Sequence, residues 1–370
     1  MNLNFVAPCM FGVEGLLATE LKRMGCKNVS AENGRVKFDG DENTLAKANV
    51  FSRLSERILI NLKEFKALTF DSLFDEVKKI PFENFISKND AFPVVGYSIN
   101  SSLHSVPNCQ KIIKKAIVER LKEAYKISWF KEDAAKVLIR FSIIKDSVCI
   151  MIDTSGEALH KRGYRAHSSI APIKETLAAA MCELARIFPD TILYDPFCGS
   201  GTILIEAALM AMKKAPGLNR KFLSENFGFL NKNAFKNARA EALDLIEKNI
   251  SFKAFGYDIS DECIALTKEN AKKAGVENLI EVKKQDVKDL KLPEDRLKVI
   301  TNPPYGERLL DIKKAEELYK IEGKVMPELK GHGYFIISPH DEFESFFGRK
   351  ATKKRKLYNG MLKCSLYMYF

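Results

Sequence analysis

The sequence predicts an α/β protein in which α+β units precede a doubly wound, mostly parallel sheet. Two observations support this fold class. From about residue 170 onward, short apolar strand-like segments alternate with helical patterns, which is typical of a parallel sheet. Before that point, strand-like and helical segments follow a different order and end in a β-branched hairpin. A chain of 370 residues is long enough for two or three such domains.

The composition sets broad limits on function. With 46% hydrophobic and 29% charged residues, the chain has the composition of an ordinary globular protein. It lacks an apolar run of the roughly 18 residues that a membrane span needs, and its first residues carry no basic leader, so we expect a cytoplasmic protein without membrane contact. The eight cysteines show no CxxC pair, which argues against a zinc site or a disulfide framework, and we expect no metal. The net charge of +11 is compatible with a polyanionic partner.

The first 60 residues predict a small α+β unit. An apolar strand is expected at 5–7, a helix over 12–24 and a second strand at 36–38. Residues 61–155 predict a second unit that begins near a strand at 57–62. Its other elements are expected in the order helix 70–79, strand 92–99, helix 108–125 and a hairpin that turns at Lys145-Asp146-Ser147.

Two basic segments are candidates for contacts with phosphates. On the helix at 108–125, the apolar stripe leaves several lysines on other faces, and an ordinary solvated face is the alternative. Residues 156–170 form a basic linker, "LHKRGYRAH" at its centre, which mixes cations with an aromatic ring as backbone binding with base stacking requires. A plain linker is the alternative there. The candidate residues are Lys111, Lys114, Lys115, Lys161, Arg162, Tyr164 and Arg165.

The remaining residues, 171–370, predict the doubly wound sheet. After a helix at 171–187, strands are expected at 191–194, 254–257, 280–284, 299–301 and 333–338. The first of them leads into "DPFCGSGT", where Gly199 and Gly201 allow a tight turn and a close backbone approach to a ligand. Gly201 is followed by neither the Lys of a P-loop nor a third glycine of a dinucleotide turn. A purely structural turn is the alternative.

Acidic residues stand at three successive strand ends. Asp195 follows the first strand, Asp258 the second and Asp286 the third. Asp258 is suited to bond a ribose diol, and Asp286 to accept from an adenine amino group. One strand-terminal Asp is commonly a cap or turn residue, but three at consecutive strand ends are harder to explain by capping alone.

The fourth strand ends in "TNPPYGERL". Two prolines cannot donate to a sheet ladder, so the chain must leave the sheet there in a stiff loop. This loop fixes the directions of Asn302 and Tyr305 at the strand end.

These motifs together resemble one protein family. "DPFCGSGT", "GYDIS" and "NPPYGERL", with "HKRGYR" and "IKETLAAAM", are similar to the THUMP-domain, class I S-adenosylmethionine-dependent RNA methyltransferases that make N2-methylguanosine. The resemblance implies a ferredoxin-like unit at 1–60, an RNA-binding THUMP domain at 61–155 and a Rossmann-like methyltransferase domain at 171–370. Some members are fused to a second methyltransferase domain, which this sequence does not show.

The resemblance also implies roles for residues. S-adenosylmethionine is the expected cofactor, bound by Asp195, Pro196, Phe197, Cys198, Gly199, Gly201, Thr202, Asp258, Ile259, Asp286, Val287 and Asn302. The expected catalytic residues are Asn302, Pro303, Pro304 and Tyr305. Asn302 Oδ1 and the Pro303 carbonyl would each accept one N–H of the target amine, while Tyr305 stacks on the extruded base.

The expected reaction is methyl transfer to the N2 amine of a guanine in RNA, with 23S ribosomal RNA as the expected substrate. A tRNA substrate, a DNA or other amine substrate, and a non-catalytic RNA-binding protein are the alternatives. Neither the modified nucleotide, nor the oligomeric state, nor any protein partner is indicated by the sequence.

Overall fold

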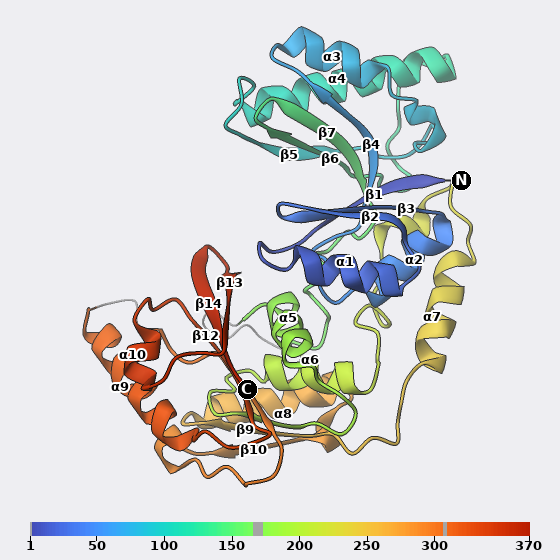
Figure 1. Cartoon of the computed structure of the whole chain (residues 1–370). Helices are drawn as coiled ribbons and strands as arrows, with labels where there is room; N and C mark the ends of the chain where they lie inside the picture. The colour runs from blue at the N-terminus through green and yellow to red at the C-terminus, as the bar shows by residue number, and fades with distance from the viewer. Residues whose placement is uncertain (1, 166–172, 306–308) are drawn as a thin grey trace.

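The computed structural model describes residues 2–165, 173–305 and 309–370. Within them the chain forms one seven-stranded sheet in its N-terminal part and another in its C-terminal part (Figure 1). The last residues of the basic linker, 166–170, and the expected helix start at residue 171 lie outside the described residues.

The N-terminal sheet is continuous across the two predicted α+β units. Strand β4 pairs with β1 on one side, through Phe5 opposite Ile60, and with β7 on the other, through Leu59 opposite Asp153. The predicted boundary at residue 60 therefore falls inside a strand that both units share. In spatial order the strands are β2 (Lys27–Glu32), β3 (Arg35–Gly40), β1 (Leu3–Pro8), β4 (Leu59–Lys66), β7 (Ser147–Asp153), β6 (Ile139–Ile144) and β5 (Val94–Ile99).

Four helices pack on this sheet. The pair α1 (Glu14–Arg23) and α2 (Glu42–Phe51) lies at the β1–β3 half, and the pair α3 (Phe70–Lys78) and α4 (Val106–Tyr125) at the other half (Figure 1). Capping boxes begin two of them: Asp41 accepts from the Thr44 N–H at 2.9 Å, and Thr69 accepts from the Ser72 N–H at 3.2 Å. Helix α2 and strand β2 were not predicted.

The predicted hairpin is confirmed as β6–β7. Lys145 and Asp146 form its two-residue turn, with φ angles of +49° and +63°. Left-handed conformations at both central residues define the turn whose twist matches that of the flanking strands.

The C-terminal sheet confirms the predicted doubly wound domain. Its first five strands in spatial order are parallel, and β14 and β13 add an antiparallel edge that was not predicted. The order is β10 (Ile280–Lys284), β9 (Lys253–Asp258), β8 (Ile192–Asp195), β11 (Lys298–Thr301), β12 (Gly333–Ser338), β14 (Leu362–Tyr369) and β13 (Lys353–Asn359).

The strand order reverses at β8, which pairs with β9 on one side and with β11 on the other. Loops that leave the carboxyl ends of such strands diverge and open a crevice, and ligands of doubly wound sheets bind there. The two predicted loops, after Asp195 and after Thr301, both begin at this point.

The remaining helices cover the second sheet or join the two parts. They are α5 (Glu175–Ala185), α6 (Thr202–Ala211), α7 (Ala234–Asp244), α8 (Asp261–Ala274), α9 (Leu309–Val325) and α10 (Phe343–Phe347). Helix α7 packs against α2 of the N-terminal part (Figure 1). None of the helices in the described part of the chain has the length and apolar character that a membrane span requires.

One carboxyl group is buried in the C-terminal core without a partner. Glu322 of α9 is 0% exposed, and neither of its carboxyl oxygens has a hydrogen-bond partner among the described residues. Burial, followed by the nearby Asp195, raises the pKa of Glu322 well above its ordinary value. The side chain is therefore held in its neutral form in this position.

We expect the change Glu322→Leu to raise the melting temperature, because an unpaired buried carboxyl group costs about 1–3 kcal/mol and leucine has a similar volume. The gain should be larger at pH 8 than at pH 5. The raised pKa means that the folded wild type keeps a proton that the unfolded chain releases above pH 4.5, so wild-type stability falls as the pH rises through this window. Thermal unfolding at both pH values measures the effect. Glu317→Leu, on the exposed side of the same helix, is the control. A lower melting temperature for Glu322→Leu at both pH values would contradict the assignment.

Candidate active site

A buried carboxyl group links the two loops at the switch point. Asp195, which is 1% exposed, accepts from Thr301 Oγ1 at 2.8 Å and from the Phe197 N–H at 3.2 Å. The first bond reaches the end of β11, just before Asn302, and the second organises the turn after β8. Burial raises the pKa of Asp195 to about 7. Asp195 does not line the cavity described below, so here it positions the loops and does not itself face a ligand.

The second strand-end acid is held by backbone amides. Asp258 accepts from the Gly199 N–H at 3.1 Å and from the Ser260 N–H at 2.9 Å. Helix α8 holds the same glycine turn in place, since Thr267 donates to the Gly199 carbonyl at 2.8 Å and Asn270 donates to the Ser200 carbonyl at 3.0 Å. The glycine turn and the carboxylate of Asp258 are thus one hydrogen-bonded unit.

Glycine is required in this turn on steric grounds. Gly201 has a φ of +76° and precedes the first residue of α6. A β-carbon at this position would lie 2.5 Å from Thr267 Cγ2, closer than real β-carbons approach. The turn can therefore lie tightly against α8 only without a side chain here.

The third strand-end acid is more open. Asp286 accepts from the Lys288 N–H at 3.0 Å, and this bond holds the pKa of its carboxyl group below the ordinary value. Its side chain is 39% exposed and also pairs with Lys288 Nζ at 3.3 Å. It is a charged acceptor at the rim of the crevice.

In the loop after β11, the side chains of Asn302 and Tyr305 are hydrogen-bonded to each other. The Tyr305 hydroxyl donates to Asn302 Oδ1 and accepts from Asn359 Nδ2 at 3.5 Å. Burial raises the pKa of the Tyr305 hydroxyl, so it remains a donor at all physiological pH values. The Tyr305 hydroxyl thus already occupies one of the two acceptor positions of Asn302 Oδ1.

One cavity of about 800 Å³ brings most of the predicted site together. Of the predicted cofactor-binding and catalytic residues, Pro196, Phe197, Asp258, Ile259, Asp286, Val287, Asn302, Pro303, Pro304 and Tyr305 line it. The other predicted cofactor-binding residues, Asp195, Cys198, Gly199, Gly201 and Thr202, are not among the residues that line it. Burial raises the pKa of the Cys198 thiol, which makes it a poor nucleophile.

Sequence reasoning missed several residues of the same cavity. They are Lys174, Gln285, Leu318, Asn359, Gly360, Met361 and Leu362. The last four form the tip of the β13–β14 hairpin, which lies beside the loop after β11. An Asn-Gly turn between two strand-like segments was the available signal.

Two predicted RNA contacts are corrected by their burial. The guanidinium of Arg162 donates to the carbonyl groups of Leu159 and Arg53, both at 2.6 Å, and lies 3.6 Å from Glu206. Tyr164, which is 5% exposed, donates to Glu206 Oε1 at 3.0 Å. In this structure both side chains anchor the linker to α6, so neither faces a polyanion and the Tyr164 ring is not free to stack on a base.

The other basic candidates differ in availability. Arg165 pairs with Glu175 at 3.2 Å, and Lys114 pairs with Glu132 at 2.5 Å. Lys161 is exposed and pairs with Glu157 at 3.5 Å, while Lys111 and Lys115 on α4 are exposed. The exposed three remain candidates for contacts with RNA.

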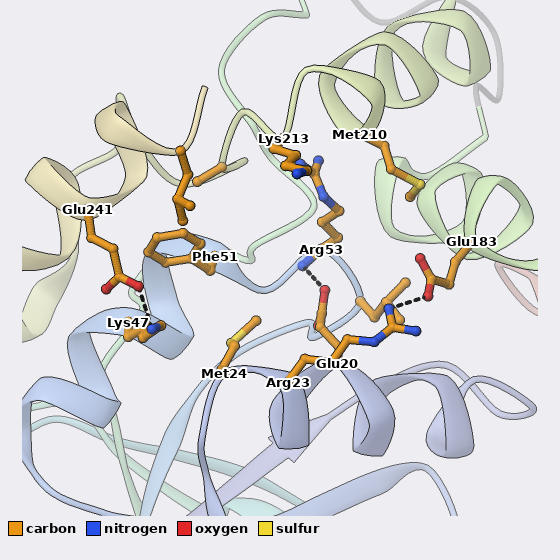
Figure 2. A pocket seen from close by; sticks show the side chains of 13 residues that line it. Glu20, Arg23, Met24, Lys47, Phe51, Arg53, Glu183, Met210, Lys213 and Glu241 are labelled. Atoms are coloured by element: carbon orange, nitrogen blue, oxygen red, sulfur yellow. Dashed lines mark hydrogen bonds and ion pairs between the residues drawn. The ribbon is translucent and has the colours of Figure 1, made fainter. Parts of the chain in front are cut away.

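A second hollow, of about 320 Å³, lies at the junction of the two parts (Figure 2). Arg53 spans it: its backbone N–H donates to Glu20 at 2.8 Å, and its guanidinium donates to the carbonyl groups of Leu209 and Lys214 at 3.1 and 2.7 Å. Ion pairs across the junction are Arg23–Glu183 at 2.8 Å and Lys47–Glu241 at 2.5 Å. The charged side chains around this hollow pair with one another across the junction. We therefore interpret the hollow as part of the contact between the two parts and not as a ligand site. In the described part of the chain, no cluster of His, Cys, Asp and Glu is arranged to hold a metal ion.

Comparison with protein families divides the chain as the sequence motifs do. Residues 162–368 match the family described as RMKL-like, methyltransferase domain. Residues 4–59 match the RlmL ferredoxin-like domain, and residues 67–153 match the THUMP domain.

Two curated relatives illustrate the match. The Bacillus subtilis (strain 168) protein named "Putative RNA methyltransferase YpsC" is 42% identical over 99% of this chain and 96% of its own length. "Ribosomal RNA large subunit methyltransferase K/L" of Syntrophotalea carbinolica is 32% identical over 98% of this chain. The chain spans about half the length of the K/L relatives, 53% in this case.

Solved structures share the whole fold. A "possible methylase" from Clostridium difficile 630 is 44% identical, with a TM-score of 0.96 over 100% of this chain and 98% of that one. A "predicted N6-adenine-specific DNA methylase" from Listeria monocytogenes is 42% identical, with a TM-score of 0.94 over 100% and 96%. SMU.472, described as "a putative methyltransferase complexed with SAH", is 39% identical, with a TM-score of 0.94 over 100% and 98%.

We expect Arg162→Ala to lower the melting temperature markedly, because the change leaves the buried carboxylate of Glu206 without its cation, a loss that typically costs about 3–5 kcal/mol. The adjacent Lys161→Ala should change it little, since that side chain is 61% exposed. Thermal unfolding of both variants measures the difference. If Arg162→Ala kept its melting temperature and lost only affinity for RNA, the anchoring role would be wrong.

Proposed function

The chain belongs to the family of RMKL-like methyltransferases with a THUMP domain, and we propose that it methylates the N2 amine of a guanine in large-subunit ribosomal RNA. The observation that carries the proposal is the single cavity in which the Asn302–Tyr305 loop faces Asp258 and Asp286. The coarser assignment, a methyltransferase acting on RNA, is supported by the family match, the THUMP domain and the name of the Bacillus relative.

S-adenosylmethionine is the methyl donor of this family, and a relative of the same fold is complexed with its demethylated product. The cavity suits this molecule on its own chemistry. Its volume of about 800 Å³ falls within the range of small-molecule sites, about 300–1,000 Å³. Asp258 and Asp286 present carboxylates at adjacent strand ends, as a ribose diol and an amino group require. When bound, the cofactor supplies a methyl group already activated by a positively charged sulfur.

The residues of the loop prepare the amine. The lone pair of an exocyclic amine is delocalised into its base, so the nitrogen must move towards tetrahedral geometry to attack. Asn302 Oδ1 and the Pro303 carbonyl can each accept one N–H and orient the lone pair. The two prolines hold these acceptors in place, and Tyr305 offers its ring to the base once its hydroxyl leaves Asn302. Since the methyl group is activated by the cofactor, no strong general base is needed.

The substrate class rests on the N-terminal part. The THUMP match over residues 67–153 favours RNA, and the K/L relatives are named for ribosomal RNA of the large subunit. A transfer RNA substrate is the second candidate, because the THUMP match does not distinguish the two RNAs. The name of the Listeria neighbour keeps an adenine amine of DNA as a third. A ribosomal RNA substrate places the protein in the cytoplasm.

Mapping of modified nucleotides tests the proposal. Total RNA and DNA from a strain that lacks the gene would be compared with those from the same strain carrying the wild-type gene. We expect one N2-methylguanosine of large-subunit ribosomal RNA to disappear in the deletion strain and to return with the gene. Loss of the modification only from transfer RNA would support the second candidate, and loss of N6-methyladenine from DNA would overturn the RNA assignment.

We expect Asn302→Ala to lower the single-turnover rate by at least about two orders of magnitude, the scale of one positioned hydrogen bond in a transition state. Affinity for S-adenosylhomocysteine, measured by calorimetry, should change little. Asp258→Ala should instead bind S-adenosylhomocysteine more weakly than wild type, because it removes the proposed partner of the ribose. Tyr305→Phe should remain active, since it keeps the ring and frees Asn302 Oδ1. Near-normal chemistry in Asn302→Ala would show that the loop does not orient the amine.

A further inference from the structure

The tip of the β13–β14 hairpin carries an unusual side chain beside the catalytic loop. Met361 is 99% exposed, the highest value among the large apolar side chains of the described residues. It also lines the rim of the active-site cavity together with Asn302 and Tyr305. An apolar side chain thus stands in solvent where a substrate must enter.

The turn itself does not require methionine. Asn359 pairs with Leu362, so Gly360 and Met361 are the two central residues. Gly360 takes the first of these positions with a φ of +64°, and Met361 is not left-handed. Such turns need glycine at the first position, while the second accepts the small polar residues common in turns. Because Met361 packs against nothing that would stabilise the fold, its residue type points to an external contact.

The hairpin is held in place by the N-terminal part of the chain. Arg355 Nε donates to the Gly12 carbonyl at 2.9 Å, and the rings of Phe11 and Tyr358 meet edge to face at 5.9 Å. A β-carbon on Gly12 would lie 2.2 Å from the Lys356 carbonyl oxygen, so the two backbones are in direct contact. The tip is therefore presented to the cavity on a supported strand pair.

The charge along the hairpin suits a polyanion. Lys353, Lys356 and Lys363 are exposed, and none of them forms an ion pair with a carboxylate of the described residues. Lys354 is already paired with Glu344 at 2.7 Å. Exposed lysines beside an apolar tip match a nucleic acid, whose phosphates lie outside its stacked bases.

We propose that Met361 is a wedge that enters the base stack of structured RNA and occupies the space left when the target guanine moves into the cavity. The inference rests on the proposed function, because a base can reach the loop at Asn302 only after leaving its stack, at a cost of a few kcal/mol. Proteins that open a stack insert apolar side chains, methionine among them, between neighbouring bases. An unbranched, flexible side chain can follow the stack as it opens. Met361 thus assists extrusion and takes no part in methyl transfer.

The test compares paired and unpaired forms of one guanine. The probes are a short RNA stem-loop that carries the guanine identified by mapping in a base pair, and a linear RNA of the same local sequence in which it is unpaired. Single-turnover methylation would be measured with wild type, Met361→Ala and Met361→Leu. We expect Met361→Ala to be slower than wild type by at least about tenfold on the stem-loop, while the two proteins act alike on the linear RNA. Met361→Leu should keep both activities, because it retains an apolar wedge.

Controls separate the possible outcomes. Leu243→Ala removes an exposed apolar side chain of α7, away from the cavity, and should match wild type on both RNAs. Equal losses of Met361→Ala on both RNAs would overturn the wedge in favour of a direct contact with the base or the cofactor. Wild-type rates for Met361→Ala on both RNAs would overturn it outright while leaving the proposed function intact. If the wild-type protein methylates neither RNA, the proposed function is wrong. The results for the Met361 variants do not enter this conclusion.

Discussion

The hydrogen bonds of Asp195 join the two loops from which the active site is built. One carboxyl oxygen receives both Thr301 Oγ1 and the Phe197 N–H, so the glycine turn after β8 and the proline loop after β11 share an anchor. The reversal of strand order at β8 makes this possible, because it places the two strand ends side by side. Asp258, bound to the same turn through Gly199, then faces the loop across the cavity. This anchor therefore sets how far the glycine turn and the proline loop lie from each other.

A second constraint keeps the two parts of the chain in one arrangement. Glu206 and Arg162 form a buried ion pair at the linker, and Arg53 binds carbonyl groups of the methyltransferase domain. Buried charges of this kind add little net stability, since removing two ions from water costs about as much as their attraction returns. Their effect lies in geometry, because the bonds from Arg53 to the carbonyl groups of Leu209 and Lys214, and from Arg162 to the Arg53 carbonyl, form only when the two parts pack in this way.

The sequence predicted those features whose signal is local. Strand-end acids such as Asp258, the prolines after Asn302 and the turn at Lys145-Asp146 are recognisable within a few residues, and the structure puts each where it was expected. The corrected residues depend on distant partners: Arg162 and Tyr164 bind Glu206, which lies about 40 residues away in the sequence and inside an apolar helix. The β13–β14 edge was missed because its lysines conceal the alternation of a strand.

The single N-terminal sheet has a consequence for how substrates are chosen. Strand β4 belongs to both small units, and the Phe11–Gly12 loop and α2 contact the catalytic part, so packed elements join the THUMP half to the cavity within the described residues. An RNA that occupies both places at once must bridge one fixed span. The length and shape of such an RNA between the two contacts would then matter for binding as well as its sequence.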